Sequence, residues 1–96
     1  MNAVNHTQLE CSVLNNAAMV PQANKSLVAS VDVLYVEHLD DGRTRDHTFT
    51  CVGAGAIAEA MVAKWTQYTK LFVTGSLTAI GNINTRIKVR SFVVLP

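Results

Sequence analysis

Apolar and polar residues alternate along most of the chain, which is the pattern of β-strands with one buried face. The first such segment covers residues 7–14, where Leu9, Cys11 and Val13 share one side. A longer segment covers residues 26–39, and the face predicted to be buried comprises Leu27, Ala29, Val31, Val33 and Tyr35. The pattern thus predicts two strands in the first part of the chain, with Tyr35 in the core.

Turn-forming residues indicate where the chain reverses. Asp40, Asp41 and Gly42 form a strong hairpin signal, and a return strand is predicted over residues 44–52. Two more alternating segments, residues 70–80 and 86–95, close the chain, and residues 81–84 are predicted to be the hairpin loop between them.

Between the predicted strands at residues 44–52 and 70–80, the spacing of apolar residues changes to that of a helix. Residues 56–65 are rich in good helix formers, and Ile57, Met61 and Trp65 recur at i, i+4 and i+8 on one apolar stripe. The predicted order is therefore β-β-β-α-β-β. An all-β chain of five mostly antiparallel strands with one short helix after the third is the order of an OB-fold barrel. We expect a single OB-fold domain over residues 1–96, with its core over about 7–95; a split α+β sheet of similar size is the alternative.

Composition narrows the class of protein. Hydrophobic residues make up 49% of the chain and charged ones 16%, which excludes a disordered chain and fits either a generous core or a surface covered by a partner subunit. The sequence has no run of about 20 apolar residues, the length that a membrane-spanning helix needs, and its N-terminus lacks the pattern of a signal peptide. A cytoplasmic protein is therefore expected. Cys11 and Cys51 lack metal-site spacing and are predicted to be buried, reduced thiols.

The middle of the chain carries a more specific pattern. A strand ends near Gly55, a helix begins with Ile57-Ala58-Glu59, and the next strand reads Leu-Phe-Val-Thr-Gly-Ser-Leu around Gly75. This stretch, FTCVGAGAIAEAMVAKWTQYTKLFVTGSLTA, resembles the core of bacterial single-stranded DNA-binding proteins, and RIKVRSFVV is similar to their last barrel strand. The resemblance implies an OB fold, with Ile57 and Trp65 closing one end of the barrel. A glycine in mid-strand suits a sharp bend there.

The sequence departs from this family where bases stack. Members that bind DNA tightly carry aromatic residues just before and at the end of the third strand, and the matching positions here are Thr48 and Ala54. Phe49 is one residue out of register, which places it on the other face. Tyr68 stands where the family has a turn glycine, and no acidic tail follows Pro96. The resemblance is therefore to a diverged or tail-less member, or to the related primosomal replication protein N.

The strongest candidate for binding lies in the last strand. Arg86, Lys88, Arg90 and Phe92 alternate with Ile87, Val89 and Ser91, so three cations and a ring are predicted to face outward while the other three face the core. A row of cations follows phosphates and a ring stacks on any base. The alternative is a solvated strand whose charges prevent edge aggregation.

Further candidates are scattered over the chain. Phe72 falls on the polar side of its strand and is either a stacking platform or an oligomer contact. Arg43 and Arg45 lie beside the hairpin turn and could contact DNA from its tip. Three nearby carboxylates neutralise much of this charge, so a solvated hairpin with no binding role is an equal alternative; they are Asp40, Asp41 and Asp46. Lys70 and Lys25 begin strands and could add phosphate contacts.

No pattern in the sequence indicates catalysis. The chain has no nucleophile elbow, phosphate-binding loop or zinc-protease motif, so neither an enzyme nor a cofactor is expected. His38 and His47 could face each other across the hairpin, but with His6 they are interpreted as surface residues rather than metal ligands.

These observations favour one function over another. The net charge is only +1, so any nucleic-acid contact must come from cations concentrated on one surface. The leading prediction is sequence-independent binding of single-stranded DNA in replication, recombination or replication restart, by a dimer or tetramer that could also contact replication or recombination proteins. The alternative is an OB-fold module for protein interaction or assembly, with weak or no nucleic-acid binding.

Overall fold

The computed structural model describes residues 6–20, 27–80 and 84–96. The segments with alternating apolar and polar residues form strands, and the alanine-rich segment forms the helix, as the sequence predicts. The elements are β1 (Thr7–Val13), β2 (Ala18–Val20), β3 (Val28–His38), β4 (Thr44–Ala54), α1 (Ala56–Lys64), β5 (Lys70–Ile80) and β6 (Asn84–Val94). Among the elements in the described residues, the three-residue β2 is the one that the sequence did not predict.

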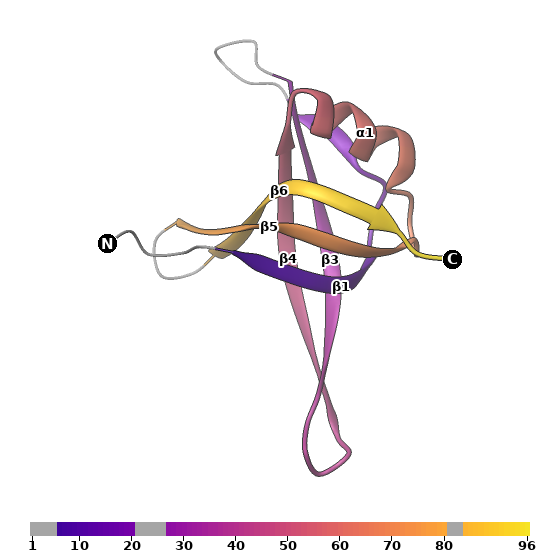
Figure 1. Ribbon diagram of the computed structural model, residues 1–96, viewed down its shortest axis with the longest axis vertical. Coiled ribbons are helices and arrows are strands. Elements are labelled where there is room, and N and C mark those ends of the chain that lie inside the picture. The colour runs from indigo at the N-terminus through magenta and orange to yellow at the C-terminus, as the bar shows by residue number, and fades with distance from the viewer. Residues whose placement is uncertain (1–5, 21–26, 81–83) are drawn as a thin grey trace.

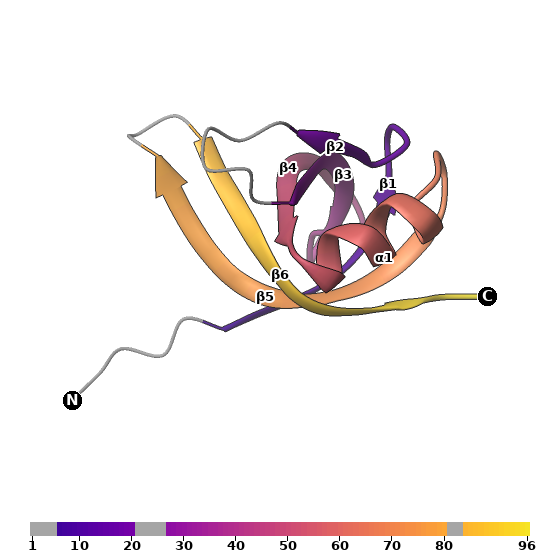
Figure 2. The same cartoon turned by 90° about the horizontal axis from the view of Figure 1, so that it is seen from above.

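The strands close into a small barrel. They follow the order β1-β5-β6-β4-β3-β2, and β1 also pairs with β3 through Ser12 opposite Leu34 and Val13 opposite Val33. Neighbouring strands are antiparallel except β4 and β6, which are parallel. Figures 1 and 2 show β5 and β6 curving around the barrel, with β2 added beside β3. The predicted OB-fold barrel is confirmed, with the helix between β4 and β5.

The core fills the barrel and the space under α1. Met61 and Trp65 are fully buried, and the partly buried Ile57 packs against the same core. The predicted apolar stripe therefore faces the core from α1, which lies over one end of the barrel (Figure 1). The remaining buried apolar side chains are Cys11, Val13, Ala17, Ala29, Val31, Val33, Cys51, Ala58, Leu71, Val73, Ile87 and Val89. In the described part of the chain, no helix is long and apolar enough to cross a membrane.

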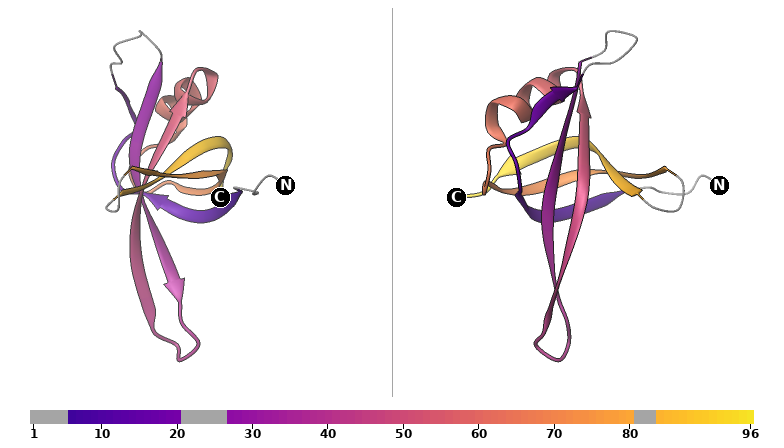
Figure 3. Two further views of the ribbon diagram at one scale, coloured as in Figure 1. Left: turned by 90° about the vertical axis from the view of Figure 1, so that its left-hand side faces the viewer. Right: turned by 180° about the vertical axis from the view of Figure 1, so that it is seen from behind.

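The β3–β4 hairpin extends well beyond the barrel (Figures 1 and 3). Its turn is the predicted one, with Gly42 at φ 87° and its N–H donating to the Leu39 carbonyl at 3.1 Å. Tyr35 lies on the core-side face of β3 but past the barrel, where it is only half-buried. The prediction of a core position for Tyr35 is therefore wrong, because β3 is longer than the barrel and this part of the strand lies outside the core.

Two backbone positions shape the barrel. A Cβ built on Gly75 would lie 2.1 Å from the carbonyl oxygen of Lys88, so only glycine allows β5 and β6 to approach this closely. Tyr68, between α1 and β5, has φ 72°, in the left-handed region that favours glycine. The turn before β5 therefore has a backbone conformation that favours glycine, although a tyrosine occupies it.

Candidate nucleic-acid interface

Strand register brings two cations together on the outer face of the barrel. Arg86 lies opposite Thr50 of β4 and Thr78 of β5, and Lys88 lies opposite Val52 of β4. Residues directly opposite on neighbouring strands share a face. Since Ile87 between the two cations is buried, Arg86 and Lys88 point outward, and both are exposed as the sequence predicts.

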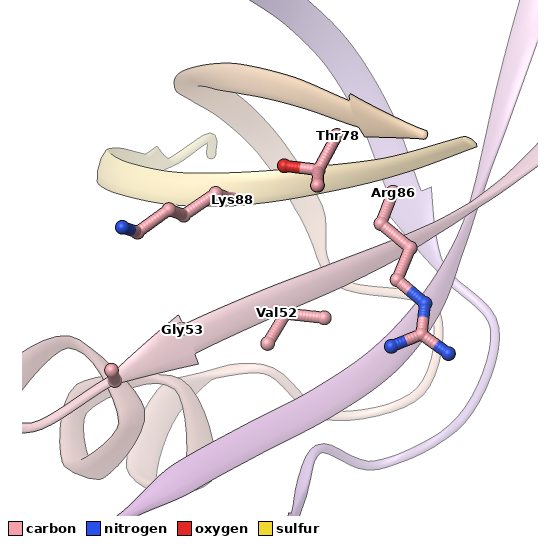
Figure 4. A pocket seen from close by; sticks show the side chains of 6 residues that line it. Val52, Gly53, Thr78, Arg86 and Lys88 are labelled. Atoms are coloured by element: carbon pink, nitrogen blue, oxygen red, sulfur yellow. The ribbon is translucent and has the colours of Figure 1, made fainter. Parts of the chain in front are cut away.

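These side chains border a hollow of about 200 Å³ whose other lining residues are mostly small and apolar: Val52, Gly53, Ala54 and Thr78. Figure 4 shows Arg86 and Lys88 on either side of Val52, with the Arg86 side chain extending across β4. Gly53 leaves room beneath for α1, because a Cβ there would lie 2.4 Å from the Met61 sulfur. The arrangement offers positive charge at the rim and an apolar floor, which suits a phosphate and the face of a base.

The sequence did not single out Val52 and Thr78 as site residues. The alternation predicted which strand face they occupy, but their place beside the cations depends on the parallel pairing of β4 with β6, which is not visible in the sequence.

A bulge breaks the predicted row of β6. Thr74 lies opposite Ser91 while Gly75 lies opposite Val89, so Arg90 has no partner in the register with β5. Arg90 is exposed as predicted, but beyond it the alternation is reversed. Ser91 is therefore exposed rather than buried, and that part of the prediction is wrong.

The same reversal turns Phe92 inward. Its ring packs against the core and meets Trp65 edge-to-face, with centroids 5.2 Å apart. The prediction that Phe92 faces outward with the three cations is wrong, because the extra residue in β6 shifts every later side chain to the other face.

Phe72 lies on the outer side of β5, opposite Glu10 of β1 and Val93 of β6, and is 37% exposed. It is six residues from Thr78 along the strand, about 20 Å in an extended chain. Its predicted outward direction is confirmed, but it contributes to a different surface from the hollow.

The hairpin arginines also lie away from the hollow. Arg43 pairs with Asp41, whose Oδ1 accepts its backbone N–H at 3.0 Å. Arg45 lies opposite Glu37, on the core-side face of the hairpin. There His47 Nε2 donates to Glu37 at 3.0 Å, and this hydrogen bond, followed by the nearby positive charge, lowers the pKa of Glu37.

The core-side face of the hairpin carries three rings. The Tyr35 ring lies 5.9 Å from His47 and 6.5 Å from Phe49, measured between centroids. Phe49 is therefore on the other face from Thr48, as predicted. His38 lies opposite Thr44 and not His47, so the two histidines do not face each other.

Lys70 is exposed at the start of β5, opposite Ser12, and borders a separate polar hollow with Glu10 and His38. Lys25 lies outside the described residues. Of the predicted binding residues, the structure thus places Arg86 and Lys88 together at one hollow and distributes Phe72, Arg43, Arg45 and Lys70 elsewhere.

Solved structures with this backbone were found, although no protein-family profile and no curated protein matches the chain in sequence. A small single-stranded DNA-binding protein from Streptomyces coelicolor aligns with a TM-score of 0.82 at 13% identity, over 98% of this chain and 94% of that one. The SSB domain of a Synechococcus protein aligns with a TM-score of 0.79 at 16% identity, over 96% and 97%.

The protein PriB from Ralstonia solanacearum is similar to the same degree, with a TM-score of 0.78 at 16% identity over 97% of this chain and all of that one (100%). These likenesses confirm at the level of the fold the resemblance predicted from the sequence. The chain has the OB fold of the solved single-stranded DNA-binding proteins and PriB.

Proposed function

We propose that this protein binds single-stranded DNA and catalyses no reaction on it. The observation that carries the proposal is the pair of outward cations, Arg86 and Lys88, at the rim of an apolar hollow on the outer face of an OB barrel. The resemblance to single-stranded DNA-binding proteins supports a cytoplasmic role in replication, recombination or replication restart.

The chemistry of the site explains how a strand would be held. Arg86 and Lys88 neutralise consecutive phosphates, Arg90 extends the positive charge along β6, and a base rests on Val52 and Ala54. Aliphatic groups give a base less attraction than a stacked ring does. Affinity per subunit is therefore modest, and we propose a homo-oligomer, dimer or tetramer, whose subunits share one strand.

Fluorescence anisotropy with a labelled oligo(dT) tests this proposal. The variant Arg86→Ala/Lys88→Ala is expected to bind roughly tenfold or more weakly at moderate salt, since it loses two phosphate contacts. Arg45→Ala/Lys70→Ala removes the same charge from other surfaces and is the matched control, expected to bind nearly as wild type. Equal affinities for the two double variants would exclude the hollow as the binding site.

A second candidate, an assembly or protein-interaction module, is favoured by one observation. Phe72 and Val93 are cross-strand neighbours on the outer side of β5 and β6 and are 37% and 60% exposed. Such a patch suits a protein contact. If this is the main function, Phe72→Ser/Val93→Ser would abolish assembly while wild-type protein would show no binding to oligo(dT).

A further inference from the structure

The outer face changes its chemistry from β6 across β4 to β3. One cross-strand row runs from Arg86 through Thr50 to Asp32, and the next from Lys88 through Val52 to Ser30. Cations thus line one side of the face, short or apolar side chains the middle, and hydrogen-bonding groups the far side.

Asp32 is held in a fixed place on that far side. It is half-buried, and its Oδ1 accepts a hydrogen bond from the Thr50 hydroxyl at 2.8 Å. Among the residues that the structure describes, its carboxylate forms no ion pair with a Lys, Arg or His. Among the described side chains, Oδ2 has no charged partner, and it lies on a face that otherwise suits an anionic ligand.

The spacing fits one nucleotide laid across the strands. Neighbouring strands lie about 4.8 Å apart, so β3 is about 10 Å from β6. This is comparable to the span of a nucleotide from its phosphate to the pairing edge of its base. With the phosphate at Arg86 and Lys88 and the base over Val52, the pairing edge would lie over β3 between Asp32 and Ser30, which are opposite Thr50 and Val52.

An ionised carboxylate accepts hydrogen bonds and donates none. It repels phosphates, so its place opposite the cations orients the backbone toward β6. The amino group at N4 of cytosine can donate to it, whereas uracil and thymine present the carbonyl O4 at the same position. We propose that Asp32, oriented by Thr50, reads the pairing edge of a bound base and selects cytosine over uracil and thymine. The inference rests on the proposed function and adds a base preference to backbone binding.

Anisotropy with labelled oligo(dC) and oligo(dU) of equal length at neutral pH tests it, because these probes differ only at the pairing edge. Wild type is expected to bind oligo(dC) about tenfold more tightly, the effect of one good base-edge contact. Asp32→Asn should bring the ratio close to one, since an amide can donate to O4 as well as accept from N4. Asp46→Asn, on the same outer face but opposite Val36 far out on the hairpin, is the matched control and should keep the wild-type ratio.

The outcomes separate the two proposals. Failure of wild type to bind either probe would overturn the proposed function itself. Binding with a wild-type ratio near one, or an equal gain for both probes in Asp32→Asn, would overturn only the base reading and leave Asp32 as a repelling charge. Should Asp32→Asn fail to fold, Thr50→Val, which keeps the carboxylate but frees its orientation, is expected to lower the ratio, and an unchanged ratio would contradict the inference.

Discussion

The outer face of β4 carries no aromatic residue. Tight binders in the single-stranded DNA-binding family, which this sequence resembles, have aromatic residues at matching positions. Thr48, Thr50, Val52 and Ala54 occupy that face, and the ring of Phe49 lies on the other. Each residue of the strand is committed to a face by the pleat, so a ring one position away cannot substitute. At the scale of single residues, the proposed binding therefore depends on Arg86 and Lys88 rather than on stacking.

The two thiols illustrate burial at the same scale. Burial, with Glu10 nearby, raises the pKa of Cys11 to about 11, and burial, with Cys11 and Asp32 nearby, raises that of Cys51 to about 12. Unfolded thiols ionise at about 8.5, so the stability that protonated thiols contribute is complete below that pH and is lost as pH rises toward these raised values. At pH 8 a chromogenic thiol reagent should leave native protein unlabelled and label both cysteines in urea; fast labelling of folded protein would contradict their burial.

Tyr68 provides a prediction about backbone strain. The residue is 77% exposed and its φ is 72°, so replacing it by glycine relieves the left-handed conformation at little cost in packing. Tyr68→Gly is expected to raise the free energy of unfolding by about 1 kcal/mol, measured by urea denaturation. A lower free energy of unfolding in Tyr68→Gly would contradict this prediction, because it would mean that the exposed ring stabilises the fold.

At the scale of elements, the sequence predicted nearly every strand and the helix, because alternation and the i, i+4 stripe of Met61 and Trp65 are local signals. It did not predict the bulge at Arg90, because a bulge is defined by the partner strand. Phe92 was consequently assigned to the wrong face. β2 was missed since its three residues, Ala18–Val20, are too few to show alternation. Local sequence patterns thus predict where the strands lie, whereas the position of the site residues depends on the register between paired strands.

The contact between β5 and β6 at Gly75 gives the prediction at this scale. Gly75→Ala would drive a Cβ into the Lys88 carbonyl, a backbone atom that cannot rotate away. We expect a loss of about 1–3 kcal/mol in unfolding free energy and weaker binding of oligo(dT), because Lys88 shifts with its backbone. Thr74→Ala, which removes atoms from the same strand, is the control. Unchanged stability in Gly75→Ala would mean that the two strands can separate without cost.

At the scale of the whole molecule, the net charge of +1 hides an uneven distribution. Arg86, Lys88 and Arg90 line β6, while at the far end of the hairpin the three carboxylates of Asp40, Asp41 and Asp46 outnumber Arg43 and Arg45. This separation supports a binding face on the barrel rather than on the hairpin. Three cations per subunit limit what one subunit can neutralise.

Salt dependence measures how many subunits share a strand. Each phosphate contact on a single strand contributes about −0.7 to the slope of log affinity against log salt, so one subunit reaches only about −2. We expect a steeper slope for wild type on a long oligo(dT), because several subunits bind together. A slope of about −2 or shallower at one chain per oligonucleotide would contradict the shared strand.

The proposed binding of DNA at the hollow between Arg86 and Lys88 is tested by an NMR titration of ¹⁵N-labelled protein with a short oligo(dT). The largest amide shifts are expected at Val52, Gly53, Thr78, Arg86 and Lys88, with small shifts at Tyr35, His47 and Lys70. Largest shifts along the hairpin rings or around Phe72 and Val93, with an unchanged hollow, would contradict it.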